Sequence, residues 1–176
     1  ACAPFRRLHV CDQNLEQIEP IKITNTHNLL VDVCMAAKFE GQSITREYPK
    51  YRATYNDSPS QICTMLARSF ADIGDIIRGK DLYRGNNKEK TKREKLEENL
   101  KNIFGHIYEE LTRGKTNKEA AKERYKGDEN YYQLREDWWA LNRQEIWKAI
   151  TCEHPGGTYF RKTCVAGNET ESNCRC

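Results

Sequence analysis

The sequence predicts a mainly α protein, in which a disulfide-stapled helical bundle follows an irregular N-terminal subdomain. Three observations support this fold class. Between Ile62 and Tyr83, apolar residues recur at three- or four-residue steps, as on one face of a helix: Ile62, Leu66, Phe70, Ile73 and Ile77. A second such block, Leu134 to Cys152, contains all three tryptophans of the chain. The third observation is the cysteine content, because 8 cysteines are spread over 176 residues.

The cysteines form an even, dispersed set without any CxxC spacing. The set comprises Cys2, Cys11, Cys34, Cys63, Cys152, Cys164, Cys174 and Cys176. A zinc or redox site would need closely paired ligands, and the one close pair ends the chain without a neighbouring histidine. We therefore expect disulfides rather than a metal or a cofactor, and hence an oxidising, extracellular setting. The pairing itself stays open.

Residues 1–59 are expected to form the irregular first subdomain. Its one predicted helix runs from about Thr26 to Glu40, with Thr24 or Asn25 as its cap. Gly41 is well placed to end this helix as a left-handed residue. The tyrosines and prolines that follow, up to Pro59, indicate a loop or an extended segment.

Residues 60–176 are expected to form a helical second subdomain. Ser60 can cap the helix of Ile62, and a turn at residues 84–87 precedes a long helix from Lys88 to about Leu111. The inner face of that helix is predicted to hold Leu96, Leu100, Ile103, Ile107 and Leu111. Residues 112–129 lack apolar periodicity and are predicted to be a mobile connection.

The last predicted helix, Tyr131 to Ile150, carries the tryptophans. Trp138 shares a face with Leu134 and Leu141, which predicts that it lies in the core, and Trp139 and Trp147 are expected to pack at its flanks. The tail from residue 151 is rich in Gly, Asn and Cys, and we expect disulfides to hold it.

The chain contains no apolar run long enough to cross a membrane and no leader at its start. We therefore expect a module excised from a longer, disulfide-rich extracellular polypeptide, with no direct membrane insertion.

No catalytic constellation is evident. The histidines His9, His27, His106 and His154 lie far apart, outside any metalloprotease or nucleophile-elbow spacing. Phosphate-binding glycine loops are also absent from the sequence. A secreted hydrolase is therefore the least favoured function class.

Positive charge is the strongest polar signal. Seven basic residues face three acidic ones between Lys80 and Lys95, and a more diluted basic run spans Arg113 to Lys126. Such residues can bind a polyanion by releasing its counterions, although charge runs are more often salt-bridged, solvated helix faces. An extracellular setting favours a sulfated glycan over nucleic acid. The glycan-binding candidates are Arg6, Arg7, Lys88, Lys90, Lys92, Arg93 and Lys95.

Several blocks of the sequence resemble the Duffy-binding-like domains of the variant erythrocyte membrane protein 1 family of malaria parasites, in particular the alpha class. These blocks are CAPFRRLHVC, HNLLVDVCMAAKFEG, ARSFADIGDIIRGKDLY, LREDWWALNRQEIWKAITC and the closing CRC. They occur in the family's order over almost the whole chain. The resemblance implies a domain of three subdomains, of which the chain corresponds to the first two and lacks the third.

The resemblance also implies a function in adhesion and no catalytic activity. It implies a place on the extracellular face of the infected red-cell membrane, within a larger anchored protein. The implied partners are a host receptor or sulfated glycan, uninfected red cells in rosetting, and neighbouring domains of the parent ectodomain. Two alternatives stay open: a binder of a protein receptor through non-basic loops, and a structural spacer.

Overall fold

The computed structural model describes residue 10 and residues 13–23, 25–55, 61–83, 85–113 and 118–152. Over these residues the secondary structure is helical and contains no strand. The elements are α2 (Gln13–Glu16), η1 (Pro20–Lys22), α3 (Thr26–Tyr55), α4 (Gln61–Arg78), α5 (Asn87–Arg113), α6 (Lys118–Arg124) and α7 (Tyr132–Ile150). The predicted mainly α fold class is therefore confirmed.

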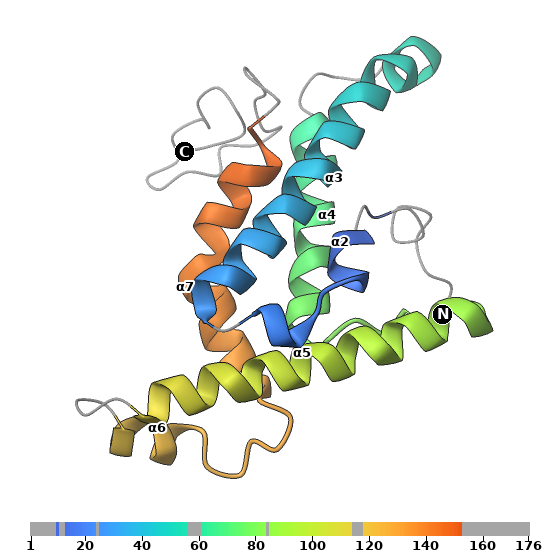
Figure 1. Ribbon diagram of the computed structural model, residues 1–176. Coiled ribbons are helices and arrows are strands. Elements are labelled where there is room, and N and C mark those ends of the chain that lie inside the picture. The colour runs from blue at the N-terminus through green and yellow to red at the C-terminus, as the bar shows by residue number, and fades with distance from the viewer. Residues whose placement is uncertain are drawn as a thin grey trace.

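Three long helices, α3, α4 and α7, pack side by side (Figure 1). Near the start of α3, the indole Nε1 of Trp138 on α7 donates a hydrogen bond to Thr26 Oγ1 at 2.7 Å. Nearer the far end, Gly41 of α3 meets Ile150 of α7. These two contacts show that α3 and α7 run parallel, whereas α4 runs in the opposite direction and packs against both of them (Figure 1).

The core lies between these helices and contains most of the apolar residues that were predicted from their helical spacing. On α4, Ile62, Leu66, Ile73 and Ile77 are buried, and Phe70 packs beside them against the rings of Trp139 and Trp147 at 5.0 and 5.2 Å. Trp138 and Trp139 are also buried, as predicted. The predicted inner-face residues Leu111 and Leu141 are exceptions, because they are 44% and 84% exposed.

Helix α5 crosses beneath the three packed helices (Figure 1). It buries Leu96, Leu100, Ile103, Phe104 and Ile107, four of which were predicted. The short elements α2 and η1 fill the angle between α3 and α5. Asn14 of α2 donates to the Asp32 carbonyl of α3 at 2.8 Å, and Asn99 of α5 donates to the Ile18 carbonyl at 3.0 Å.

The prediction that Gly41 ends its helix is wrong, since α3 continues to Tyr55. Gly41 instead allows α3 and α7 to approach closely. A Cβ at this position would overlap the carbonyl oxygen of Ile150 and lie 2.9 Å from its carbonyl carbon. Local sequence does not distinguish a glycine that ends a helix from one that permits a helix crossing.

Two predicted irregular segments are partly helical. Residues 42–55 belong to α3, and Pro49 lies inside that helix although it cannot donate a backbone hydrogen bond there. The predicted connection over residues 112–129 contains the end of α5 and the whole of α6. The predicted caps Thr24 and Ser60 lie outside the described residues, whereas Asn25 accepts a hydrogen bond from the Asn28 N–H at 3.0 Å, as a helix cap does.

Of the three described cysteines, one is disulfide-bonded and two are free thiols. Cys34 and Cys152 are free thiols, which contradicts the prediction of a disulfide at each. Burial, together with the nearby Glu145 carboxylate, raises the pKa of the Cys34 thiol. Cys63 is buried and disulfide-bonded. The other five cysteines, Cys2, Cys11, Cys164, Cys174 and Cys176, lie outside the described residues, and their pairing stays a prediction.

None of the described helices is long and apolar enough to cross a membrane.

Candidate functional site

The basic candidates of α5 lie at its start, where a capping arrangement fixes the helix. The Asn86 side-chain oxygen accepts hydrogen bonds from the backbone N–H groups of Lys88 and Glu89, both at 3.0 Å. Glu89 Oε2 in turn accepts from the Asn86 N–H at 3.3 Å and from the Tyr83 hydroxyl at 2.7 Å. These bonds hold the pKa of the Glu89 carboxyl below its usual range. Backbone N–H groups in the first turn of α5 therefore have hydrogen-bond acceptors, which fixes the start of the helix.

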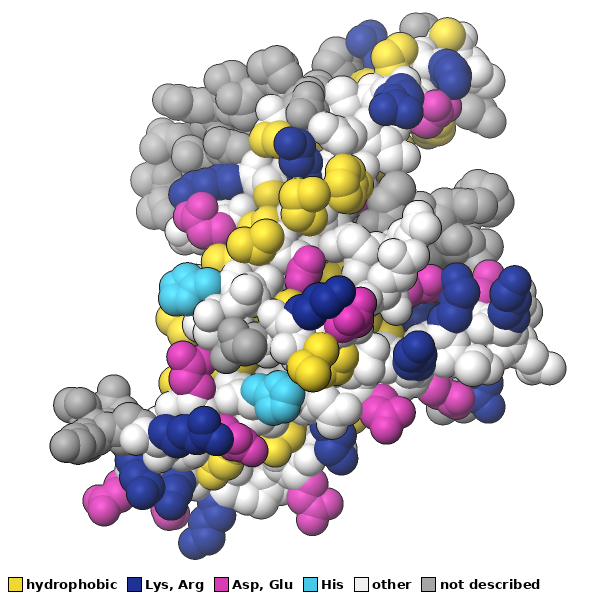
Figure 2. All heavy atoms as spheres, viewed as in Figure 1, with side chains coloured by type: hydrophobic (Ala, Val, Ile, Leu, Met, Phe, Trp, Pro, Cys, Tyr) yellow, Lys and Arg dark blue, Asp and Glu magenta, His cyan; other side chains and the backbone are white. Residues whose placement is uncertain are grey.

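Three of the predicted glycan-binding residues share one face of α5. Lys88, Lys92 and Lys95 follow steps of four and three residues, which align side chains along a helix. All three are exposed. Lys92 forms an ion pair with Glu16 of α2 at 2.8 Å. Figure 2 shows Lys and Arg side chains over this end of α5, interspersed with Asp and Glu.

The other two candidates on α5 point to a different side. Lys90 and Arg93 line a pocket of about 360 Å³ between the end of α4, the start of α5 and Tyr132 of α7. The acids Asp81, Glu94 and Glu97 line the same pocket. The Lys90 ammonium lies 3.7 Å from the Glu94 carboxylate. This pocket has mixed charge and is less suited to a polyanion than the lysine face is.

A buried arginine lies next to the pocket and contacts two of its lining residues, Glu97 and Ile76. Arg135 of α7 forms two hydrogen bonds to the Glu97 carboxylate and two more to the carbonyls of Ile76 and Ile77, at 2.6 to 3.2 Å for the carbonyls. It thereby satisfies acceptors at the end of α4 that have no partner within the helix. The sequence reasoning did not single out Arg135, because an arginine in a charged helix does not look different from its neighbours.

The second basic run is largely used in local ion pairs. Arg113 pairs with Glu109 at 2.9 Å, and Arg124 makes a bidentate contact with Asp137 of α7 at 2.6 and 2.7 Å. The latter contact anchors α6 to α7. These ion pairs favour the interpretation of this second basic run as a salt-bridged helix face rather than a polyanion-binding surface.

Two further candidates, Arg6 and Arg7, lie outside the described residues, as do His9 and His154. Over the described part of the chain, no three His, Cys, Asp or Glu side chains are grouped so as to hold a metal ion.

Comparison with known proteins decides the family. The Duffy binding domain family matches residues 1–176. The chain belongs to this family. No curated protein matches the chain.

Two solved structures show which members of the family it resembles. One is the NTS-DBL1-alpha and CIDR-gamma double domain of the PfEMP1 protein from the Plasmodium falciparum varO strain, with 42% identity and a TM-score of 0.78. That match covers 99% of this chain but 24% of the other. The other is a PfEMP1 DBLb domain bound to human ICAM-1, with 34% identity and a TM-score of 0.66. It covers 84% of this chain and 32% of the other.

These matches confirm the resemblance to a Duffy-binding-like domain of PfEMP1. The chain spans about a quarter to a third of the length of the structures it matches. Duffy-binding-like domains are adhesion modules that bind receptors and not enzymes, so the prediction that this chain is not an enzyme is also confirmed.

Proposed function

We propose that this Duffy-binding-like domain is a host-receptor adhesion module, exposed on the surface of the infected red cell, and that it binds heparan sulfate-like glycans. Membership of the family supports the adhesive role, and the related DBLb domain is bound to the host protein ICAM-1. Capture of uninfected red cells through their surface glycans is part of the same proposal.

The observation that supports a glycan is the exposed lysine face of α5. From Lys88 to Lys95 the helix rises by about 10 Å, so three ammonium groups follow one line along its surface. A linear polyanion can contact such a line with several sulfates at once and release a counterion at each contact. The Lys92 side chain is 52% exposed although it pairs with Glu16, so a sulfate can contact its ammonium group beside the carboxylate.

Lys90 and Arg93 contribute less to the proposed glycan contact, because they line the mixed-charge pocket beside Glu94 and Glu97. Arg6 and Arg7 are retained as candidates from the sequence alone.

A protein receptor is the second candidate. Leu82 and Leu141 are 92% and 84% exposed, and exposed apolar side chains are the usual anchors of protein interfaces. Binding through them would depend little on salt. A purely structural spacer, the third possibility, would bind neither heparin nor red cells.

Heparin affinity of the 176-residue chain tests the proposal. We expect the combined charge reversal Lys88→Glu, Lys92→Glu and Lys95→Glu to weaken binding by at least about tenfold, while the helical circular dichroism signal is kept. Binding by the unmodified chain should fall steeply as salt is raised. The matched control reverses Lys118, Lys122 and Lys126, which lie in and just after α6, so that both variants have the same net charge.

Equal loss in the two triple variants would show that net charge alone attracts heparin and would refute a site on α5. Binding that is insensitive to both salt and the α5 reversal would favour the protein-receptor alternative.

A further inference from the structure

Three apolar side chains form a row on the outer surface of α3. Val31, Met35 and Phe39 are 62%, 41% and 44% exposed, and their four-residue spacing places them on one side of the helix. The row is about 12 Å long. The opposite side of α3 is in the core, where Leu29, Val33, Ala36 and Ala37 are fully buried. Figure 2 shows hydrophobic side chains gathered along α3 on this face of the molecule.

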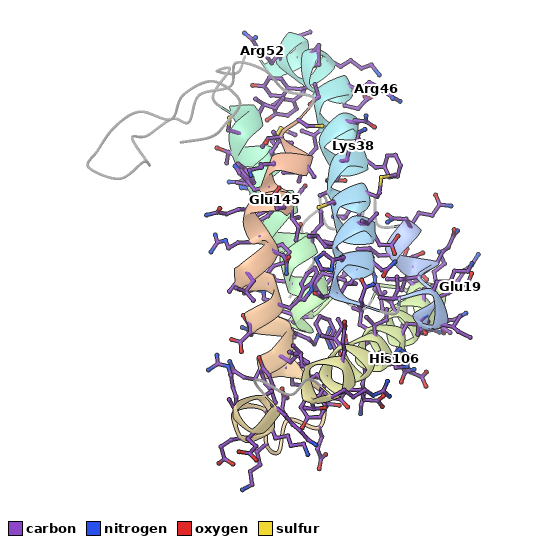
Figure 3. The ribbon with its side chains drawn as sticks, turned by 60° about the vertical axis from the view of Figure 1, so that its left-hand side comes forward. Glu19, Lys38, Arg46, Arg52, His106 and Glu145 are labelled. Carbon is purple, nitrogen blue, oxygen red and sulfur yellow. The ribbon has the colours of Figure 1, made fainter. Side chains whose placement is uncertain are left out.

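Basic side chains accompany and extend this row. Lys38 lies within it, and Arg46 lies beyond its end, in the half of α3 that projects from the bundle, whereas Arg52 lies on another side of α3 (Figure 3). All three are exposed. The described residues provide none of them with an ion pair. We call Val31, Met35, Lys38, Phe39 and Arg46 together the α3 face.

The acids of α3 do not offset this charge. Glu47 is exposed but pairs with Lys50 at 2.9 Å. Glu40 is buried and accepts a hydrogen bond from Ser69 at 2.6 Å. Asp32 is half-buried where α2 packs on α3. The α3 face therefore has a net positive charge and an apolar row that no described segment covers.

We propose that the α3 face docks a protein segment that presents apolar side chains at helical spacing followed by carboxylates. The apolar part of such a segment would cover Met35 and Phe39, and its carboxylates would meet Lys38 and Arg46. Pairing of this kind is how amphipathic helices are recognised along a second helix. The proposal concerns a surface separate from the lysine face of α5 and does not depend on glycan binding.

The arrangement of the residues favours a protein segment over the other possible occupants. A sulfated glycan could meet the basic groups, but it has no apolar ridge that would remove Met35 and Phe39 from water. A membrane surface is usually met by an apolar stripe with basic residues along both edges. Here Lys38 lies beside the last apolar residue of the row, Phe39, and Arg46 lies beyond it, which gives the face a direction along the helix axis.

Two synthetic helical peptides of about 20 residues provide the test. They share leucines at positions i, i+4 and i+8, and they differ only in having glutamates or lysines in their last two turns. Fluorescence anisotropy measures their binding to the 176-residue chain. We expect the glutamate peptide to bind at least about tenfold more tightly than the lysine peptide, with an affinity that falls as salt is raised.

Variants of the chain then locate the contact. The pair Met35→Ser with Phe39→Ser, and the pair Lys38→Glu with Arg46→Glu, should each weaken binding of the glutamate peptide by at least about tenfold. The matched controls are Leu111→Ser, an exposed apolar residue on α5, and Lys118→Glu with Lys122→Glu on α6. These residues are exposed in the fold, and circular dichroism verifies that each variant keeps its helices.

Three outcomes would overturn the proposal. The first is equal binding of the two peptides, or binding that the α3 variants leave unchanged. The second is that the chain binds phosphatidylserine vesicles through Met35 and Phe39 but ignores the peptide, which would assign the face to a membrane. The third is self-association in sedimentation that Met35→Ser with Phe39→Ser abolishes, which would assign it to a second copy. Heparin affinity should be the same in these apolar variants, so the two proposals fail separately.

Discussion

The guanidinium of Arg135 and the carboxylate of Glu97 join α7 to α5 through two hydrogen bonds of 2.5 and 2.9 Å. The Arg135 side chain has no exposed surface, whereas that of Glu97 is 43% exposed. The same guanidinium satisfies two carbonyls at the end of α4. One charged side chain therefore fixes three helices at the point where the mixed-charge pocket begins.

Removing Glu97 should destabilise the fold more than its partial exposure suggests. Glu97→Ala leaves the Arg135 charge buried without its partner, and we expect a loss of roughly 3 kcal/mol in the free energy of unfolding. Arg135→Met combined with Glu97→Ala should recover part of this loss, because no unpaired charge then remains in the interior. Urea denaturation of the single and double variants measures both effects.

Glu98 provides the matched control, since it is the exposed glutamate next to Glu97 on α5. We expect Glu98→Ala to change stability by at most about 0.5 kcal/mol. If Glu97→Ala behaved like Glu98→Ala, the Arg135 pair would not stabilise the fold.

Gly41 should not tolerate a methyl group. A Cβ there would meet the backbone of Ile150, which belongs to the facing helix and cannot rotate away. We expect Gly41→Ala to lower the free energy of unfolding by about 1–3 kcal/mol, although alanine favours helix over glycine by about 1 kcal/mol. Thermal or urea denaturation measures the change.

Gly105 is the matched control within a helix. A Cβ at Gly105 would lie 3.5 Å from the Tyr131 hydroxyl, an ordinary contact. Gly105→Ala should therefore stabilise the protein modestly. Stabilisation by both substitutions would show that α3 and α7 do not approach as closely as the structure indicates.

The contact between α6 and α7 should weaken in acid. The Arg124 guanidinium, supported by the Tyr125 hydroxyl, holds the pKa of Asp137 below its ordinary value of 3.8. Because the unfolded chain binds this proton more readily, the stabilisation is fully present above the unfolded pKa and is lost as pH falls through the lowered folded pKa. Urea midpoints measured at several values between about pH 5 and pH 3 report this loss.

Asp137→Asn identifies the group responsible. The stability difference between the unmodified chain and this variant should shrink as the pH falls through that window, whereas Glu129→Gln, at an exposed carboxyl nearby, should leave the pH dependence unchanged. A pH profile that Asp137→Asn leaves intact would contradict the assignment.

Helix positions were predictable where burial follows a simple period. The stripe from Ile62 to Ile77 is one face of α4, and its burial is almost complete. The α3 face was not predicted, because helical spacing fits an exposed row as well as a buried one. Val31, Met35 and Phe39 have helical spacing too, but Val33 and Ala37 on the opposite side are also four residues apart, and spacing alone does not tell which of the two rows is buried.

The basic residues of α5 show how far sequence analysis extends to the candidate site. Their number and exposure were predictable from composition, but their division into a lysine face and a pocket wall was not. That division follows from the angle at which α5 crosses α4 and α7, because the crossing turns Arg93 toward the pocket and leaves Lys88 and Lys95 in solvent.

By itself, the sequence determined the helical fold class and the family, because these depend on residue period and on motifs that are local in the chain. Tertiary structure decided that Gly41 lies at a helix crossing, that Arg135 is buried and that Cys34 and Cys152 are free thiols. Each of these features depends on contacts between residues that are far apart in the sequence. A local sequence pattern does not specify such contacts.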